Sequence, residues 1–246
     1  MKCIILAAGY ATRLYPLTEN FPKPLLEVCG KAILDWIVDD LEKSELIDEF
    51  IVVSNHKFVD HFELWASMRC EKAKITVLDD GTEDNAHRLG AVRDIAFAVE
   101  QCHVTDDVMV VAGDNLTDFS LHGFIDYFLE KRHTCIMRHY EADVNKLRKT
   151  GVIEIDECEM VLQMQEKPME PVSNWAVPPF YIYVKEDLPK IFQAVTSGVC
   201  NVDAPGDFIA WLCGESEVYA YLMPGTRYDI GDLASYERVQ EVYKSV

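Results

Sequence analysis

Short apolar runs alternate with segments of helical periodicity in the first half of the chain. The runs at 2–6, 50–54, 75–78 and 108–112 have the length and composition of buried strands. Between them, apolar residues recur at helical spacing over 32–43, 58–67 and 89–100. This alternation predicts an α/β fold with a mostly parallel sheet and helices on both faces.

The pattern changes after about residue 132. Closely spaced strand-like runs at 134–139, 151–155, 161–166 and 180–184 indicate antiparallel or mixed pairing. Helices are expected at about 187–195 and 207–212, then a strand at 218–222 and a terminal helix at about 233–243. We therefore expect a single domain over 1–246, with a first part at about 1–132 and an inserted mixed-sheet lobe at about 133–225.

The formal net charge of −19 disfavours nucleic acid and anionic membrane as partners, because phosphate surfaces attract basic proteins. No apolar stretch approaches the roughly twenty residues that cross a bilayer, and the N-terminus lacks a signal-type segment. We therefore expect a cytoplasmic protein. If so acidic a protein handles nucleotides, it must gather its few cations at the site or bridge carboxylates to phosphates through a divalent metal.

Eight cysteines are scattered along the chain without a C-x-x-C pair or zinc-type spacing, which predicts reduced thiols. They are Cys3, Cys29, Cys70, Cys102, Cys135, Cys158, Cys200 and Cys213. Four histidines, at positions 56, 61, 133 and 139, also lack ligand spacing and are expected to be surface or core residues.

A turn of small residues, Ala7-Ala8-Gly9, follows the first strand. Small side chains leave backbone N–H groups accessible to an anionic phosphate, and Arg13 and Lys23 lie within reach to neutralise its charge. The spacing fits neither the Walker loop nor the dinucleotide G-x-G-x-x-G motif. The alternative is an ordinary strand-to-helix loop.

Two aspartates are candidate metal ligands. Asp114 follows the strand at 108–112 and one glycine, which places it at the carboxyl edge of the sheet, and Asp229 follows a later strand. Two carboxylates can hold Mg²⁺ while leaving positions for phosphate oxygens and water. Alternatively, each aspartate caps a turn or a helix.

The opening string, from Leu6 to Thr18, followed by Pro22-Lys23-Pro24-Leu25, resembles the signature L-A-A-G-x-G-T-R-L-x-P-L-T and K-P-L of the sugar nucleotidyltransferases, or NDP-sugar pyrophosphorylases. Ala11 stands where that family usually has a second glycine. The resemblance covers nearly the whole chain. Within this family, the chain resembles the glucose-1-phosphate thymidylyl- and uridylyltransferases. It implies a Rossmann-like nucleotide-binding part at about 1–132 and an acceptor-binding lobe at about 133–225.

The resemblance implies roles for particular residues of the nucleotide side. Ala7, Ala8, Gly9, Arg13, Lys23 and Asp114 would bind the nucleotide, and Asp114 and Asp229 would hold Mg²⁺. The string from Arg227 to Asp232 resembles the family's W-x-D-I-G-T. Asp232 stands in place of the threonine of that string, and we expect it to cap the terminal helix. Asn85 and Gly90 fit the spacing of the residues that read the base in this family, although an Asx turn explains Asn85 almost equally well.

On the acceptor side, Glu166-Lys167-Pro168 resembles the family's E-K-P string, in which Glu binds a sugar hydroxyl and Lys binds the sugar phosphate. Gly151 corresponds to a glycine that contacts the sugar. The implied reaction joins a sugar 1-phosphate to the α-phosphorus of a nucleoside triphosphate and releases pyrophosphate. Arg13, Lys23 and Lys167 would be the catalytic cations.

Two alternatives stay open. One is a CTP:phosphocholine-type cytidylyltransferase, in which Trp175, Phe180 and Tyr181 would contribute to a cage for a quaternary ammonium. The other is a non-catalytic, nucleotide-binding regulatory protein, which should lack a key cation or carboxylate, yet all are present here. The sequence leaves open the base, the acceptor, an allosteric nucleotide site and assembly into a homo-oligomer.

Overall fold

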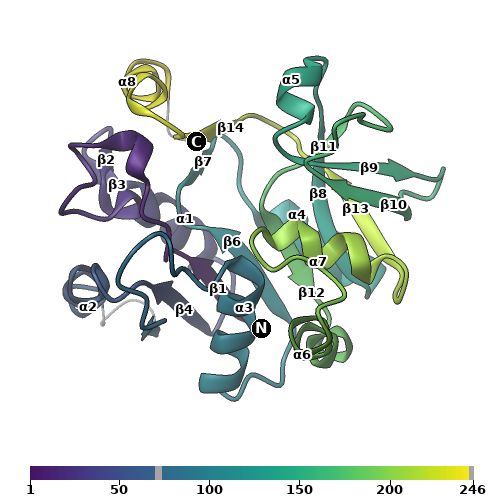
Figure 1. The fold of residues 1–246 in the computed structure, drawn as a ribbon, viewed down its shortest axis with the longest axis horizontal. Coiled ribbons are helices and arrows are strands. Elements are labelled where there is room, and N and C mark those ends of the chain that lie inside the picture. Colours follow the sequence, from purple (N-terminus) through teal and green to yellow (C-terminus); the bar gives the residue numbers. More distant parts are fainter. Residues whose placement is uncertain (70–73, 244–246) are drawn as a thin grey trace. The chain divides into compact units, whose positions relative to one another are not determined.

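The computed structural model describes residues 1–69 and 74–243 (Figure 1). The chain forms two compact units. The first unit comprises Met1–Arg88, Ala112–His122 and Pro224–Val246, and the second comprises Leu89–Val111 and Gly123–Met223. The single domain expected from the sequence, with parts meeting near residue 132, stays a prediction.

Three parallel strands form the sheet of the first unit, in the order β1 (Lys2–Leu6), β4 (Glu49–Ser54) and β5 (Ile75–Asp79). Phe50 to Val53 are at most 2% exposed, as expected for strands that are buried on both faces. Helix α1 (Ile33–Leu41) buries one apolar face, and α2 (Val59–Ser67) packs against β4 and β5. The predicted α/β class is confirmed, with parallel core strands flanked by helices.

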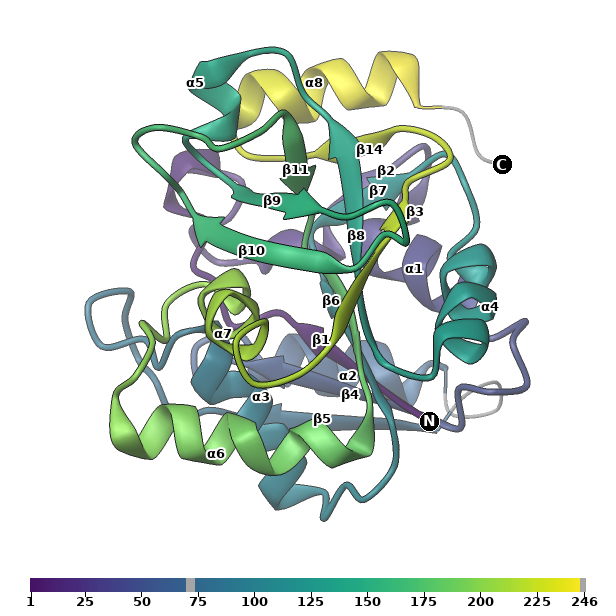
Figure 2. The same cartoon turned by 90° about the vertical axis from the view of Figure 1, so that its right-hand side faces the viewer.

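The second unit contains a mixed sheet (Figure 2). Its antiparallel neighbours follow the order β10 (Val161–Glu166), β9 (Gly151–Ile155), β11 (Trp175–Val177), β8 (Thr134–Tyr140), β12 (Phe180–Tyr183) and β6 (Val108–Ala112). Strand β13 (Val218–Leu222) runs parallel to β8. The mixed pairing predicted beyond residue 132 is therefore confirmed.

Helices of the second unit pack on one another and on this sheet. They are α3 (Ala91–Gln101), α4 (His122–Lys131), α5 (Val144–Leu147), α6 (Leu188–Ser197) and α7 (Pro205–Leu212), with the 3-10 turn η3 (Lys185–Asp187) before α6. Helix α3 contacts α6 and α7, and α7 lies against β10 (Figure 2). The sequence analysis did not anticipate α4, α5 or β11.

Several very short elements of the first unit position polar residues. They are the turns η1 (Thr12–Leu14) and η2 (Lys23–Leu25), the hairpin β2 (Glu27–Val28) with β3 (Lys31–Ala32), and the ribbon β7 (Asn115–Thr117) with β14 (Arg227–Asp229). Two- or three-residue strands carry too little periodicity to be recognised from sequence. Of these elements, the β7–β14 ribbon is formed by pairing between distant segments.

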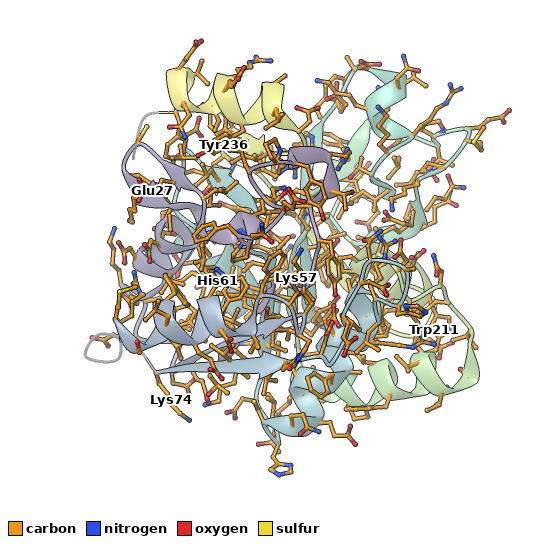
Figure 3. All side chains as sticks on the ribbon, turned by 60° about the vertical axis from the view of Figure 1, so that its left-hand side comes forward. Glu27, Lys57, His61, Lys74, Trp211 and Tyr236 are labelled. Carbon is orange, nitrogen blue, oxygen red and sulfur yellow. The ribbon has the colours of Figure 1, made fainter. Side chains whose placement is uncertain are left out.

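Helix α8 (Leu233–Val242) closes the first unit. The side chain of Asp232 accepts a hydrogen bond from the backbone N–H of Ser235 at 2.8 Å, which lowers the pKa of Asp232 and confirms its predicted role as helix cap. Tyr236 of α8 donates its hydroxyl to the backbone oxygen of Glu27 at 2.7 Å (Figure 3). The helix is thereby bonded to the β2–β3 hairpin.

Tyr243, which directly follows α8, belongs to a buried cluster with residues from or beside several short elements of the first unit. Its ring meets those of Trp36 and Tyr228 edge-on, with centroids 5.3 and 5.5 Å away, and its hydroxyl donates to the backbone oxygen of Thr117 at 3.1 Å. The buried members of this cluster are Leu14, Leu26, Val28, Ile33, Leu116, Ile230, Val239 and Tyr243. Several of these residues adjoin the strings that the sequence analysis singled out.

Within the described residues, no helix is long and apolar enough to cross a membrane. The seven cysteines in those residues are free thiols, as predicted, and Cys70 lies outside them.

We expect Tyr243→Ala to lower the free energy of unfolding by about 3 kcal/mol, because it removes a buried aromatic ring that packs in this cluster. Urea denaturation measures the change. Val242→Ala, whose side chain is 42% exposed, serves as the neighbouring control and should stay within about 0.5 kcal/mol of the original protein. Equal effects of the two variants would contradict the importance of the cluster.

Candidate active site

The turn after β1 leaves its backbone accessible. A Cβ atom added at Gly9 would meet no heavy atom within 4 Å. Ala11 adopts the left-handed conformation, with φ of 46° and ψ of 41°, which favours glycine. Its carbonyl oxygen accepts hydrogen bonds from the backbone N–H of Leu14 at 2.9 Å and from the Thr18 hydroxyl at 2.8 Å. These two bonds hold a backbone conformation that costs alanine about 1 kcal/mol.

Buried side chains fix this turn to the segments that follow β4 and β5. Asn55, which is fully buried, donates its side-chain amide to the backbone oxygen of Ala8 at 2.9 Å. Tyr10, only 4% exposed, donates its hydroxyl to the backbone oxygen of Thr82 at 2.8 Å. Sequence reasoning missed both residues. For Tyr10, the sequence offered one signal of such a contact, which is a large side chain within a turn of small residues.

Lys23 and Asp114 form a close ion pair at the end of this turn. The Lys23 Nζ lies 2.6 Å from the Asp114 Oδ2, and Lys23 is only 7% exposed. The backbone N–H of Gly113 donates to the carbonyl of Leu6 at 3.0 Å, which places Asp114 beside the end of β1. Two residues that the sequence analysis assigned to the nucleotide are thus in direct contact.

A chain of polar contacts continues from Asp114 to Asp229. The Asn115 side chain donates to Asp114 Oδ1 at 2.6 Å and accepts from Arg227 Nη1 at 2.5 Å, and that guanidinium nitrogen lies 3.6 Å from Asp229 Oδ2. Asp229 also faces Asn115 directly in the β7–β14 pairing. The pairing therefore brings the two predicted metal ligands to the same end of the ribbon. Sequence reasoning gave Asn115 and Arg227 no role.

Arg13 lies at the edge of the same group. Its guanidinium nitrogens are 3.8 Å from the place that a Cβ on Gly231 would occupy, and its charge contributes to lowering the pKa of Asp232. The side chain is exposed and makes no hydrogen bond or ion pair with the described part of the chain. Its guanidinium is therefore available to an anionic ligand.

The residues present fit a magnesium ion. Asp114 and Asp229 supply carboxylate oxygens, the ligands that Mg²⁺ prefers, and Asp229 is 56% exposed. Over residues 1–69 and 74–243, no group of three or more His, Cys, Asp or Glu side chains could hold a metal ion. One or two protein carboxylates, completed by substrate phosphates and water, is a usual arrangement for Mg²⁺.

The predicted base-reading residues lie around the start of α3. Asn85 is exposed, and the Asx turn here is formed by Asp84, whose Oδ1 accepts from the backbone N–H groups of Ala86 and His87 at 2.8 and 3.1 Å. Gly90 precedes α3 with φ of 91°. Asn85 belongs to the first unit and Gly90 to the second. Their role in reading the base stays a prediction.

The predicted acceptor residues come together in the second unit. Gly151 on β9 is the direct pairing partner of Glu166 on β10, and the Lys167 Nζ lies 3.9 Å from the Glu166 Oε1. The Glu166 side chain is 12% exposed and that of Lys167 is 51% exposed. Lys167 has a φ of 48°, a left-handed conformation that is uncommon for a residue other than glycine. Such conformations cluster at functional sites.

The Glu166 carboxyl has a strongly perturbed pKa. The pKa is raised from 4.5 to about 7, chiefly by burial; the Lys167 charge opposes the shift, and the nearby Asp207 and Asp203 contribute to it. Burial also raises the pKa of Asp207. A carboxyl that titrates near neutrality next to a cation is typical of an active site.

The aromatic cage that the phosphocholine alternative needs is not formed by the residues considered for it. Phe180 and Tyr181 are 0% and 3% exposed within β12. The guanidinium of Arg138 lies 4.5 Å from the centre of the Trp175 ring and already covers it. Arg138 is held there by an ion pair with Glu159 at 2.7 Å.

The sequence pattern of the family described as nucleotidyl transferase matches residues 2–245. The chain therefore belongs to the nucleotidyl transferase family.

Its curated relatives include several sugar nucleotidyltransferases. The chain is 26% identical over 262 residues to a UTP–glucose-1-phosphate uridylyltransferase of Staphylococcus epidermidis, covering 94% of this chain and 88% of that protein. It is 28% identical over 97% of its length to a protein of Sulfolobus acidocaldarius provisionally named a mannose-1-phosphate guanyltransferase, and 29% identical over 94% to the bifunctional protein GlmU of Methanocaldococcus jannaschii. The chain spans only 62% and 51% of these two relatives.

Solved structures share the fold. A structure from Bacillus anthracis, provisionally named a glucose-1-phosphate thymidylyltransferase, matches with a TM-score of 0.84 and 21% identity, covering 100% of this chain and 96% of that one. A UDP-glucose pyrophosphorylase complexed with UDP-glucose matches with a TM-score of 0.79 and 21% identity, covering 98% and 97%.

We expect Glu166→Gln to raise the free energy of unfolding by about 2 to 3 kcal/mol at pH 8 and to leave it almost unchanged at pH 4.5. The folded-state pKa is raised, so the stability carried by the neutral carboxyl is present below pH 4.5 and is lost as the pH rises through about 7. The amide of Glu166→Gln stays neutral at every pH in this range, so the variant keeps that stability at pH 8.

Urea denaturation across this pH range tests the expectation. The exposed Glu170→Gln, four residues away, is the control and should show no such pH dependence. A Glu166→Gln effect that is the same at both pH values would contradict the burial of an ionisable carboxyl.

Proposed function

We propose that this protein transfers a nucleoside monophosphate from a nucleoside triphosphate to a sugar 1-phosphate, giving an NDP-sugar and pyrophosphate. Family membership and relatives named for sugar 1-phosphates support the proposal. The observation that carries it is the 2.6 Å contact of Lys23 with Asp114 at the end of the bare turn, continued through Asn115 and Arg227 to Asp229. A cation and two carboxylates near the exposed Gly9 backbone suit a triphosphate with its metal.

On the nucleotide side, the backbone of Ala8 and Gly9 receives the phosphates and Arg13 stabilises the leaving pyrophosphate. Lys23 positions the α-phosphate. Its burial supports this role, because a poorly hydrated ammonium interacts strongly with an approaching anion. We further propose that Asn85 and the backbone of Gly90 read the base.

On the acceptor side, Glu166 accepts a hydrogen bond from a sugar hydroxyl and Lys167 binds the sugar phosphate. Gly151 lies opposite Glu166 in the β9–β10 pairing, and the absence of a side chain there leaves space for the Glu166 carboxyl and the end of the Met164 side chain. The half-exposed Lys167 side chain is accessible to a ligand. A cation is needed here because two polyanions must approach each other.

Asp114 and Asp229 hold the magnesium ion, for which their carboxylates are the suitable ligands. When bound, Mg²⁺ neutralises phosphate charge and favours attack at phosphorus. The net charge of −19 supports the further proposal that neither nucleic acid nor anionic membrane is a partner.

The proposed chemistry is a direct displacement. An oxygen of the sugar phosphate forms a bond to the α-phosphorus, and the bond from that phosphorus to the β-phosphate oxygen breaks, so pyrophosphate carries away the electron pair. The attacking oxygen is already anionic and needs no general base. The protein contributes positioning and charge stabilisation, with no covalent enzyme intermediate.

Pyrophosphate release in the presence of Mg²⁺ tests the proposal. The panel pairs each of dTTP, UTP, CTP, GTP and ATP with glucose 1-phosphate, with other sugar 1-phosphates and with phosphocholine. Release with a sugar 1-phosphate supports the proposed function and identifies both substrates. Release confined to CTP with phosphocholine, or no release with any pair, would refute it.

We expect Asp114→Asn and Asp229→Asn each to reduce kcat by at least about a hundredfold, because each removes one ligand charge from the metal. Asp229 is 56% exposed, so Asp229→Asn should fold normally. The amide oxygen of Asp114→Asn can still accept the Lys23 hydrogen bond, but the compensating charge is lost, so the melting temperature of this variant should fall. Manganese binding followed by electron paramagnetic resonance should weaken in both.

The exposed Asp106→Asn is the matched control and should leave kcat and manganese binding unchanged. Full activity in either active-site variant would remove that aspartate from the metal assignment.

A further inference from the structure

The Glu166 carboxyl lies between two glycines that come from different elements. A Cβ atom on Gly151 of β9 would lie 3.1 Å from the Glu166 Oε2, and a Cβ on Gly206 of α7 would lie 2.1 Å from the same oxygen. The second distance is far below van der Waals contact. A side chain at position 206 and the Glu166 carboxyl therefore cannot both occupy the places seen here.

The backbone that carries Gly206 is anchored on α3. The carbonyl oxygens of Val202 and Asp203 accept from the backbone N–H groups of Val92 and Ala91, both at 3.1 Å. Gly90 packs so closely that its Cβ would lie 2.5 Å from the Val202 oxygen. The segment that leads into α7 is thus bonded along the first turn of α3.

The start of α7 is also held internally. Asp207 Oδ2 accepts from the backbone N–H of Ala204 at 3.2 Å, and the backbone N–H of Asp207 donates to the Ala204 carbonyl at 3.1 Å. On the other side, β10 is fixed by its pairing with β9. The main chain on both sides is therefore fixed, and the side chain of Glu166 is the part that can move.

We propose that Gly206 is a positioning residue for acceptor binding: its bare backbone sets the place of the Glu166 carboxylate and thereby the contact with the sugar hydroxyl. This inference rests on the proposed function, in which Glu166 binds the acceptor. A methyl group at position 206 would also lie 2.9 Å from the Met164 Cε. It therefore displaces the Glu166 carboxylate and the end of the Met164 side chain, and both can move by side-chain rotation at small cost to the fold. The acceptor then loses a hydrogen bond to a charged group, whose geometry is confined to a few tenths of an ångström.

The test compares the KM values of both substrates in the full-length protein. Gly206→Ala should raise the acceptor KM by at least about tenfold, the loss expected for one hydrogen bond to a charged group. The nucleotide KM and the melting temperature should stay close to those of the original protein, because the displaced group belongs to the acceptor side.

A second variant separates positioning from general damage. Glu166→Asp shortens the side chain by one methylene and withdraws the carboxylate from position 206. Adding Gly206→Ala to the Glu166→Asp variant should therefore raise the acceptor KM by a much smaller factor than adding it to the original protein. Gly214→Ala is the control, because its Cβ would make only an ordinary 3.4 Å contact with the Trp211 carbonyl, and it should change neither KM.

Three results would overturn the proposal. They are an unchanged acceptor KM in Gly206→Ala, a parallel rise of both KM values with a large loss of melting temperature, and a double variant whose effect equals the product of the single effects. The original protein is assayed in the same series. If it releases no pyrophosphate with any sugar 1-phosphate, the proposed function fails, and this inference fails with it. Normal turnover with an unaltered KM in Gly206→Ala refutes the inference alone.

Discussion

The buried ammonium group of Lys23 constrains much of the first unit. Lys23 is only 7% exposed, and a buried charge is costly unless an opposite charge lies beside it, which Asp114 supplies at 2.6 Å. The pair ties the segment around Lys23 to the residues that follow β6, and Asn115 and Arg227 extend the contacts to Asp229. In a protein with a net charge of −19, cations are scarce, and three of them gather around these carboxylates. The ligands that the proposed reaction needs are held in place by the same contacts that compensate the buried charge.

Among the described residues of the second unit, no cation lies as close to the Glu166 carboxyl as Lys23 lies to Asp114. Glu166 is largely buried with its nearest cation at 3.9 Å, and the neighbouring acidic residues contribute to raising its pKa to about 7. Such an arrangement lowers stability at neutral pH and leaves the carboxyl free for a hydroxyl ligand. Lys167 and Ala11, both in left-handed backbone conformations, are further examples of local strain within the strings assigned to the site. The poor charge compensation of Glu166 thus falls on a residue to which we assign function.

Membership of the nucleotidyl transferase family explains the architecture, while the acceptor side has features of its own. Arg138 stacks on Trp175 and forms an ion pair with Glu159, which fills a surface that could otherwise have received a cationic ligand. The aromatic residues of β12 are core residues. Under the proposed function, acceptor choice depends on the group formed by Gly151, Glu166, Lys167 and the start of α7.

The sequence by itself determined most of the longer elements, with α4 as an exception, the cap of the terminal helix and the strings to which we assign the site. Continuous apolar runs specify buried strands, and a capping aspartate acts on a residue three positions away, so these features are encoded locally. Tertiary structure alone decided that Asp229 faces Asn115, that Tyr243 completes the cluster containing Leu14, and that Gly206 adjoins Glu166. Each of these contacts joins residues that are far apart in the chain, and the pattern of a single segment does not specify which distant segment it packs against. The pKa of Glu166 belongs to this second group, because burial by distant segments, which no local string of residues encodes, is its main cause.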